Sequence, residues 1–177
     1  MLQPVVLTGG PNAGKTTLIR AFRQMGFPVI CEQATEVILE RRFCPISSPV
    51  EFRRETLARQ MAAEQVLAAE TRPVFIDRGA YDGRAYCKAT DCAEPGFLTD
   101  LEAGMYPLTF LFEPVPTWQD DGVRYEDMAF SKTITPLLET VYREAGAQVV
   151  RVPFMGVEDR IDLILSVLTD RNYSREG

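Results

Sequence analysis

The hydrophobic pattern of this chain consists of short apolar runs that alternate with stretches of helical periodicity. The apolar runs are Val5–Leu7, Pro28–Cys31, Pro73–Asp77, Leu108–Phe112 and Gln148–Val152. Short runs of this kind, bounded by polar and turn residues, are typical of strands that are buried on both faces. Five such strands separated by helices predict an α/β fold, in which a parallel sheet carries helices on both faces.

Helices are expected between these runs. The first places Leu18, Phe22 and Met25 at helical spacing and has Gly26 as its C-cap. Further helices are expected from about Val37 to Arg42, over 50–70, 79–88 and 97–103, up to Ala145, and from Val157 onward. Pro136 either begins or kinks the helix that ends at Ala145. The last helix carries the clearest apolar stripe of the chain, formed by Val157, Ile161, Ile164, Leu165 and Leu168.

The pattern contains no linker, internal repeat or low-complexity segment that would divide the chain. We therefore expect residues 1–177 to form a single domain. Residues 43–49 are expected to form a loop. The irregular stretch over about 114–127, which contains prolines and a glycine, is expected to be a mobile, lid-like loop.

Composition and charge exclude several classes of function. The chain has 177 residues, a net charge of -6 and no basic block, so a nucleic-acid partner is not expected. It contains no histidine, and its four cysteines fit no zinc-binding spacing, which predicts reduced thiols. Neither a long apolar segment nor a basic-then-apolar leader is present. We therefore expect a soluble, cytoplasmic protein that does not contact a membrane.

The most specific motif lies directly after the first apolar run. It matches the phosphate-binding loop pattern at Gly9, Gly14, Lys15 and Thr16. Glycines let backbone N–H groups approach a polyphosphate, while the lysine reaches its terminal phosphates and the threonine hydroxyl holds Mg²⁺. The residues predicted to bind the nucleotide are Gly9, Gly10, Pro11, Asn12, Ala13, Gly14, Lys15, Thr16 and Thr17. We therefore expect ATP and Mg²⁺ as cofactors, the alternative being a glycine turn that matches by coincidence.

Charged residues stand where ligands bind in a parallel sheet, beyond the carboxyl ends of the strands. Asp77 is expected to order Mg²⁺ together with Thr16, or to be a helix-capping or surface acid. Arg78 could neutralise a transferring phosphoryl group, or form a salt bridge across the sheet edge. Glu32 could accept a proton from a substrate hydroxyl, or be an acid favoured by a helix dipole. Arg124 could close over the nucleotide, or lie in a solvated loop.

Two further groups of residues carry weaker signals. Arg53, Gln60 and Glu64 share one face of the long helix and could line a pocket for an acceptor. A solvated helix face with ion pairs is the favoured interpretation of the same three residues. Phe154 and Met155 follow the last strand, where they could contact an adenine or belong to the core.

Several of these segments together resemble a known family. They are Leu7–Thr17, Glu32 with Ala34, Phe75–Gly79, Asp121–Arg124, Val141–Gly146 and Val152–Pro153. In this order they resemble small bacterial predicted ATPases with an AAA-domain label, which are similar to deoxynucleoside and ribosylnicotinamide kinases. The resemblance implies the three-layer P-loop NTPase fold with sheet order 2-3-1-4-5. It also implies that Glu32 acts as a base and that Asp77 and Arg78 serve the metal and the phosphates. The chain departs from deoxynucleoside kinases at Gly79, where they have serine, and in having a single arginine in its lid.

We therefore predict a P-loop enzyme, an ATP-dependent phosphotransferase that acts on a small hydroxyl-bearing metabolite such as a nucleoside. Lys15, Arg78 and Arg124 would stabilise phosphoryl charge in it. The alternative is an ATPase that regulates or assembles a partner and has no small-molecule acceptor. A GTPase is disfavoured because the nearest match to a guanine-reading motif, Lys88–Asp91, has the wrong spacing. A true AAA+ machine is not expected, and the sequence leaves the acceptor and the oligomeric state open.

Overall fold

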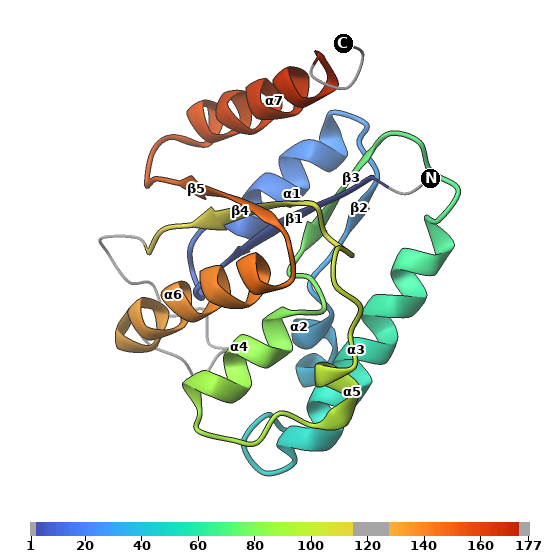
Figure 1. The fold of residues 1–177 in the computed structure, drawn as a ribbon, viewed down its shortest axis with the longest axis vertical. Coiled ribbons are helices and arrows are strands. Elements are labelled where there is room, and N and C mark those ends of the chain that lie inside the picture. The colour runs from blue at the N-terminus through green and yellow to red at the C-terminus, as the bar shows by residue number, and fades with distance from the viewer. Residues whose placement is uncertain (1–2, 115–127, 174–177) are drawn as a thin grey trace.

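A computed structural model describes residues 3–114 and 128–173, and at its centre lies a parallel β-sheet (Figure 1). Its five strands are β1 (Gln3–Gly9), β2 (Val29–Ile30), β3 (Pro73–Asp77), β4 (Leu108–Phe112) and β5 (Gln148–Val152). They are arranged in the order β2-β3-β1-β4-β5, and every neighbouring pair is parallel. The predicted α/β class, sheet order and strand positions are therefore confirmed.

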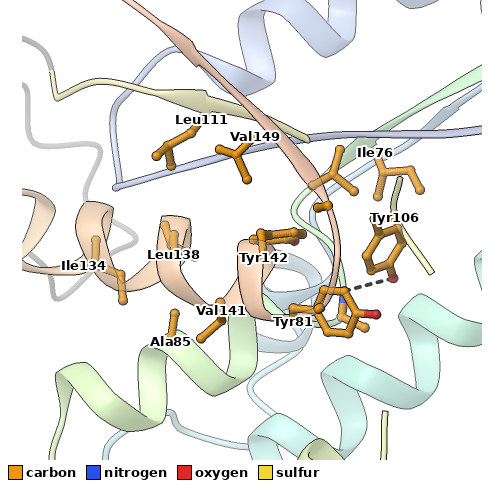
Figure 2. Close-up of a cluster of buried hydrophobic side chains, with 14 of the residues drawn as sticks. Ile76, Tyr81, Ala85, Tyr106, Leu111, Ile134, Leu138, Val141, Tyr142 and Val149 are labelled. Carbon is orange, nitrogen blue, oxygen red and sulfur yellow. Dashed lines mark hydrogen bonds between the residues drawn. The ribbon is translucent and has the colours of Figure 1, made fainter. Parts of the chain in front are cut away.

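The described residues form seven helices. They are α1 (Lys15–Gln24), α2 (Gln33–Leu39), α3 (Pro49–Val66), α4 (Asp82–Ala89), α5 (Gly96–Thr99), α6 (Met128–Glu144) and α7 (Val157–Tyr173). Helices α1 and α7 cover one face of the sheet, where Phe22 and Ile164 join the core. Helices α4 and α6 cover the other face, and Figure 2 shows Val141 of α6 beside Ala85 of α4. Among the described residues, none of the helices has both the length and the apolar character to cross a membrane.

The strand register brings the predicted chemical groups to one edge of the sheet. Leu7 of β1 lies beside Asp77 of β3, and Gly9 lies beside Phe112 of β4. The segment that follows β1 therefore begins next to the end of β3. This edge is the place where an open parallel sheet binds its ligands.

Some predicted elements differ in extent from the observed ones. Helix α5 covers only Gly96–Thr99, with Asp100 as its C-cap, and the chain then continues in turns to β4. Helix α6 runs through Pro136 without ending, so this proline does not begin the helix. In α7 only Ile164 of the predicted stripe is fully buried, while Val157 is 43% exposed. The last helix thus packs along the margin of the core.

The inner side of α3 is polar and buried, which corrects the prediction of a solvated face for Gln60 and Glu64. Gln60 donates a hydrogen bond from Nε2 to Glu64 Oε1 at 2.7 Å. The hydroxyl of Tyr106 donates to the same carboxylate oxygen at 2.6 Å. The backbone N–H of Ala80 donates to that hydroxyl at 3.0 Å, and a dashed line marks this bond at Tyr106 in Figure 2. The periodicity of α3 could not reveal this arrangement, since the partners come from segments far away in sequence.

The buried acid Glu64 predicts a pH dependence of stability. Burial raises the pKa of Glu64 above its ordinary value of 4.5, against the effect of the hydrogen bonds from Tyr106 and Gln60. The unfolded chain then loses this proton at lower pH than the folded chain, so the wild type loses stability relative to Glu64→Gln as pH rises. We expect the free energy of unfolding of the variant minus that of the wild type to increase as pH rises above about 4.5, the ordinary pKa of this carboxyl, and to level off once the folded carboxyl has also ionised.

Urea unfolding at each pH measures this difference. Glu51→Gln, which changes an exposed residue of the same helix, is the matched control and should stay within about 0.5 kcal/mol of the wild type. A difference between Glu64→Gln and the wild type that is constant with pH would contradict the prediction.

Candidate active site

The loop between β1 and α1 has a backbone that only glycine can supply at several positions. Gly9 and Gly14 have φ angles of 144° and 86°, which side-chain-bearing residues rarely adopt. A Cβ atom on Gly9 would lie 2.7 Å from the carbonyl oxygen of Phe112. A Cβ on Gly10 would lie 2.0 Å from Ser131 Oγ. The loop is therefore packed tightly between β4 and α6, with its shape determined before any ligand binds.

Helix α1 begins directly after this loop, and the side chain of its first residue, Lys15, extends back to the loop. Gly14 is the N-cap of α1, so the positive end of the helix dipole faces the loop. Lys15 is buried, and its Nζ donates hydrogen bonds to the carbonyl oxygens of Gly9 at 3.1 Å and Gly10 at 2.8 Å. A cavity of about 800 Å³ adjoins the loop residues 12–17. Backbone N–H groups, helix dipole and lysine together suit a polyphosphate.

Asp77 and Thr16 meet beside this loop in an arrangement that suits a magnesium ion. Thr16 Oγ1 donates a hydrogen bond to Asp77 Oδ2 at 2.8 Å, while the buried Oδ1 has no hydrogen-bond partner among the described residues. Burial, followed by the nearby charge of Glu32, raises the pKa of Asp77. No cluster of three acidic, cysteine or histidine ligands occurs in the described ranges. Since Mg²⁺ usually takes one or two carboxylates together with substrate phosphates, these two residues fit it.

Arg78 is the charged centre of the site. It adopts the left-handed conformation, with φ of 66°, and its side chain reaches the phosphate-binding loop at Gly9. Its Nε donates to Glu32 Oε1 at 2.7 Å, and its Nη1 donates to Asp82 Oδ2 at 3.0 Å and to the carbonyl oxygen of Gly9 at 3.1 Å. Its Nη2 is buried with no hydrogen-bond partner in the described chain. Burial disfavours the charged form of Arg78 and lowers its pKa. The net pKa is nevertheless well above its ordinary value, because of the surrounding groups Tyr86, Glu32, Asp82 and Asp77.

Asp82 is a part of this site that the sequence did not reveal. Besides Arg78, it accepts hydrogen bonds from Thr8 Oγ1 at 2.9 Å and from the hydroxyl of Tyr142 at 2.7 Å. The hydroxyl of Tyr142 in turn accepts the backbone N–H of Gly79 at 3.1 Å. In the sequence, Asp82 has the ordinary position of an acid in the first turn of a helix. Only Thr8, a polar residue inside an apolar strand, signals that a buried partner is required.

Arg160 of α7 is a second residue that the sequence did not reveal. It is buried, its Nη1 donates to the carbonyl oxygen of Ala13 at 3.0 Å, and its guanidinium lies 5.7 Å from the ring centre of Phe112 and 5.3 Å from that of Phe154. Its position beside the apolar residue Ile164 on the helix is the signal that could have found it. Phe154 is 54% exposed and borders the cavity at the loop, so it does not belong to the core.

A second cavity, of about 490 Å³, lies on the other side of Glu32 and Asp77. Apolar side chains from five helices, including Phe52, Tyr86 and Phe130, form much of its wall. Its polar lining includes Arg53, Thr56 and Gln60 of α3 together with Arg78. Glu32 and Asp77 line both cavities, so the two spaces meet at these carboxylates.

The structure thus brings Lys15, Thr16, Glu32, Asp77 and Arg78 together, as the sequence predicted. The predicted surface position of Asp77 is wrong, since its side chain is buried. The alternative interpretation of Arg78, a salt bridge, is present in the structure, because Arg78 pairs with Glu32 and Asp82. The predicted lid over 114–127 lies outside the described residues except for its first position, and Arg124 lies outside them too.

Comparison with solved structures identifies the fold. A deoxyadenosine kinase from M. mycoides, solved with dCMP and dCDP bound, gives a TM-score of 0.68 at 12% identity over 94% of this chain and 99% of that one. A thymidylate kinase from Ehrlichia chaffeensis gives 0.67 at 12% identity over 94% and 98%. A thymidylate kinase from Candida albicans gives 0.65 at 16% identity over 97% and 93%. This chain therefore has the fold of P-loop nucleoside and nucleotide kinases.

The sequence comparisons add the family. A search of curated proteins found no match. The family model described as AAA domain matches residues 4–160, which is most of the chain and includes the phosphate-binding loop and every strand. The chain therefore belongs to this AAA domain family.

Proposed function

We propose that this protein is an ATP-dependent phosphotransferase that phosphorylates a small hydroxyl-bearing molecule such as a nucleoside. The observation that supports it is the pair of cavities that meet at Glu32 and Asp77. ATP would bind at the loop, with its terminal phosphate toward the two carboxylates. The acceptor would occupy the second cavity, which an enzyme that only hydrolyses ATP does not need. Kinases among the structures of the same fold support this assignment.

In the proposed reaction, the acceptor hydroxyl oxygen forms a bond to the γ-phosphorus of ATP. The bond from that phosphorus to the bridging β,γ oxygen breaks, ADP leaves, and the hydroxyl proton passes to the Glu32 carboxylate. Glu32 is oriented for this role by Arg78 on one oxygen and by Thr35 on the other, at 2.7 and 3.0 Å. Lys15 and Arg78 would stabilise the charge that develops on the phosphoryl oxygens. Arg124 stays a predicted contributor to the same charge stabilisation.

Thr16 and Asp77 would hold Mg²⁺, which when bound neutralises phosphate charge. Their hydroxyl and carboxylate oxygens are the ligand type that this ion prefers. The remaining contributions come from the chain itself. The glycines of the loop bring N–H groups to the phosphates, and the walls of the second cavity exclude water from the acceptor.

Glu32→Gln tests the proposed transfer. The amide keeps the size of the carboxylate but cannot accept the proton, so transfer should fall by a factor of about 100 or more while ATP binding remains. Transfer is measured with γ-labelled ATP and a pool of cellular metabolites, followed by separation of labelled products. Glu158→Gln, which changes an exposed acid at the start of α7, is the control and should match the wild type.

The same experiment distinguishes transfer from hydrolysis. A wild-type protein that releases phosphate at full rate and labels no acceptor would overturn the proposed function. That result would favour an ATPase that acts on a partner.

Asp77→Asn tests the magnesium site. The variant removes the charge beside the Thr16 hydroxyl, so the Mg²⁺ concentration required for half-maximal binding of a fluorescent ATP analogue should rise about tenfold or more. Binding is measured by fluorescence titration at fixed nucleotide and increasing metal concentration. Asp100→Asn, at an exposed position after α5, should leave the titration unchanged. An unchanged titration for Asp77→Asn would show that this carboxylate does not order the metal.

A further inference from the structure

The proposed phosphoryl transfer does not use the buried acid Glu64, although this residue contacts the wall of the second cavity. Glu64 is 7% exposed, and its neighbour one helical turn earlier, Gln60, lines the cavity. Hydrogen bonds join these two residues to Tyr106 and Ala80, and the donor and the acceptor in each bond can be deduced from chemistry. These directions determine whether Gln60 presents its amide nitrogen or its carbonyl oxygen to the molecule in the second cavity.

The chain of hydrogen bonds starts at a group that can only donate. The backbone N–H of Ala80 donates to the hydroxyl oxygen of Tyr106 at 3.0 Å. The hydroxyl hydrogen of Tyr106 is therefore directed elsewhere, and it goes to Glu64 Oε1 at 2.6 Å. An ionised carboxylate is an acceptor only, so this oxygen requires donors from each of its partners.

Gln60 meets this requirement with its amide nitrogen. The Nε2 atom of Gln60 donates to Glu64 Oε1 at 2.7 Å, because an amide oxygen turned to the same place would face an anionic oxygen. The carbonyl oxygen of Gln60 consequently lies on the other side of the amide. It accepts no hydrogen bond from the part of the chain that the structure describes. In a cavity with largely apolar walls, this oxygen is a fixed acceptor that requires a donor from the bound molecule.

We propose that Glu64 is a positioning residue that holds the carbonyl oxygen of Gln60 toward the second cavity. The site thereby selects substrate molecules that present a hydrogen-bond donor to α3, such as the N–H of an amino or lactam group. A molecule with only hydrogen-bond acceptor atoms there would cover this oxygen and leave it unpaired, which is the kind of mismatch that polar sites reject strongly. This inference rests on the proposed function, since it concerns the acceptor of the same reaction.

Pairs of nucleosides that differ in one donor test the proposal. Adenosine and purine riboside differ only by the amino group, and thymidine and 3-methylthymidine differ at the ring N–H. The wild type should bind or phosphorylate the donor-bearing member of at least one pair about tenfold better. Glu64→Gln should reduce this ratio to about threefold or less, because an amide at position 64 can either donate or accept and leaves Gln60 free to rotate. Both kcat/KM and calorimetric binding are measured.

Two further variants separate positioning from general damage. Glu51→Gln changes an exposed acid of the same helix and should keep the wild-type ratio. Tyr106→Phe removes the donor that orients Glu64 and should lower the ratio, with thermal melting used to verify that it folds. A merely structural role for Glu64 would weaken both members of a pair equally, so the ratio would not change.

The outcomes distinguish this inference from the proposed function. Transfer to these nucleosides with no preference within either pair, or an unchanged preference in Glu64→Gln, would overturn the inference and leave the phosphotransferase assignment intact. Failure of all four nucleosides to bind would also overturn the inference. Release of phosphate without transfer to any metabolite would overturn the proposed function itself.

Discussion

The site depends on one buried positive charge. The guanidinium of Arg78 contacts Glu32 at the start of α2, Asp82 in α4 and the carbonyl oxygen of Gly9 in the phosphate-binding loop. A buried charge is very unfavourable unless it is paired and hydrogen-bonded. Removing any one partner would leave another charge uncompensated, so α2, α4, β3 and the loop are held at mutually determined positions. The need to pair the charge of Arg78 therefore determines where the phosphate-binding loop lies relative to the second cavity.

The turn that places Arg78 also directs the rest of the site. Because Arg78 is left-handed, the two following N–H groups leave the strand pattern and point toward α6 and the segment before β4. Gly79 donates to Tyr142, which orients Asp82, and Ala80 donates to Tyr106, which orients Glu64. Two adjacent peptide groups thus organise two buried acids, one beside the phosphate loop and one beside the second cavity. Glycine is favoured at position 79, since a Cβ there would lie 2.7 Å from the hydroxyl of Tyr142.

Whether a residue of this site can be predicted from the sequence depends on how far apart in sequence it and its interaction partners lie. Strand positions and the residues at strand ends could be predicted, because short apolar runs are local signals and parallel strands bring their carboxyl ends to one edge. Glu32, Asp77 and Arg78 were predicted in this way. Asp82 and Arg160 were not, since their partners Thr8 and Ala13 lie 74 and 147 residues away. Glu64 was assigned to a solvated face because its helix has no apolar stripe that would indicate which side is buried.

The two cavities also differ in which groups would hold the proposed ligands, and this difference explains why ATP can be inferred from sequence more directly than the acceptor molecule. At the loop, much of the recognition comes from backbone N–H groups and a helix terminus, which require glycines at fixed spacing and therefore leave a motif. In the second cavity, side chains from several helices form the wall, and their meaning depends on partners such as Tyr106. A glutamine in a helix has two opposite hydrogen-bonding faces, and only the fold determines which one is presented. In the proposed reaction, selectivity for the acceptor molecule would therefore be a tertiary property, while affinity for phosphate would be largely a local one.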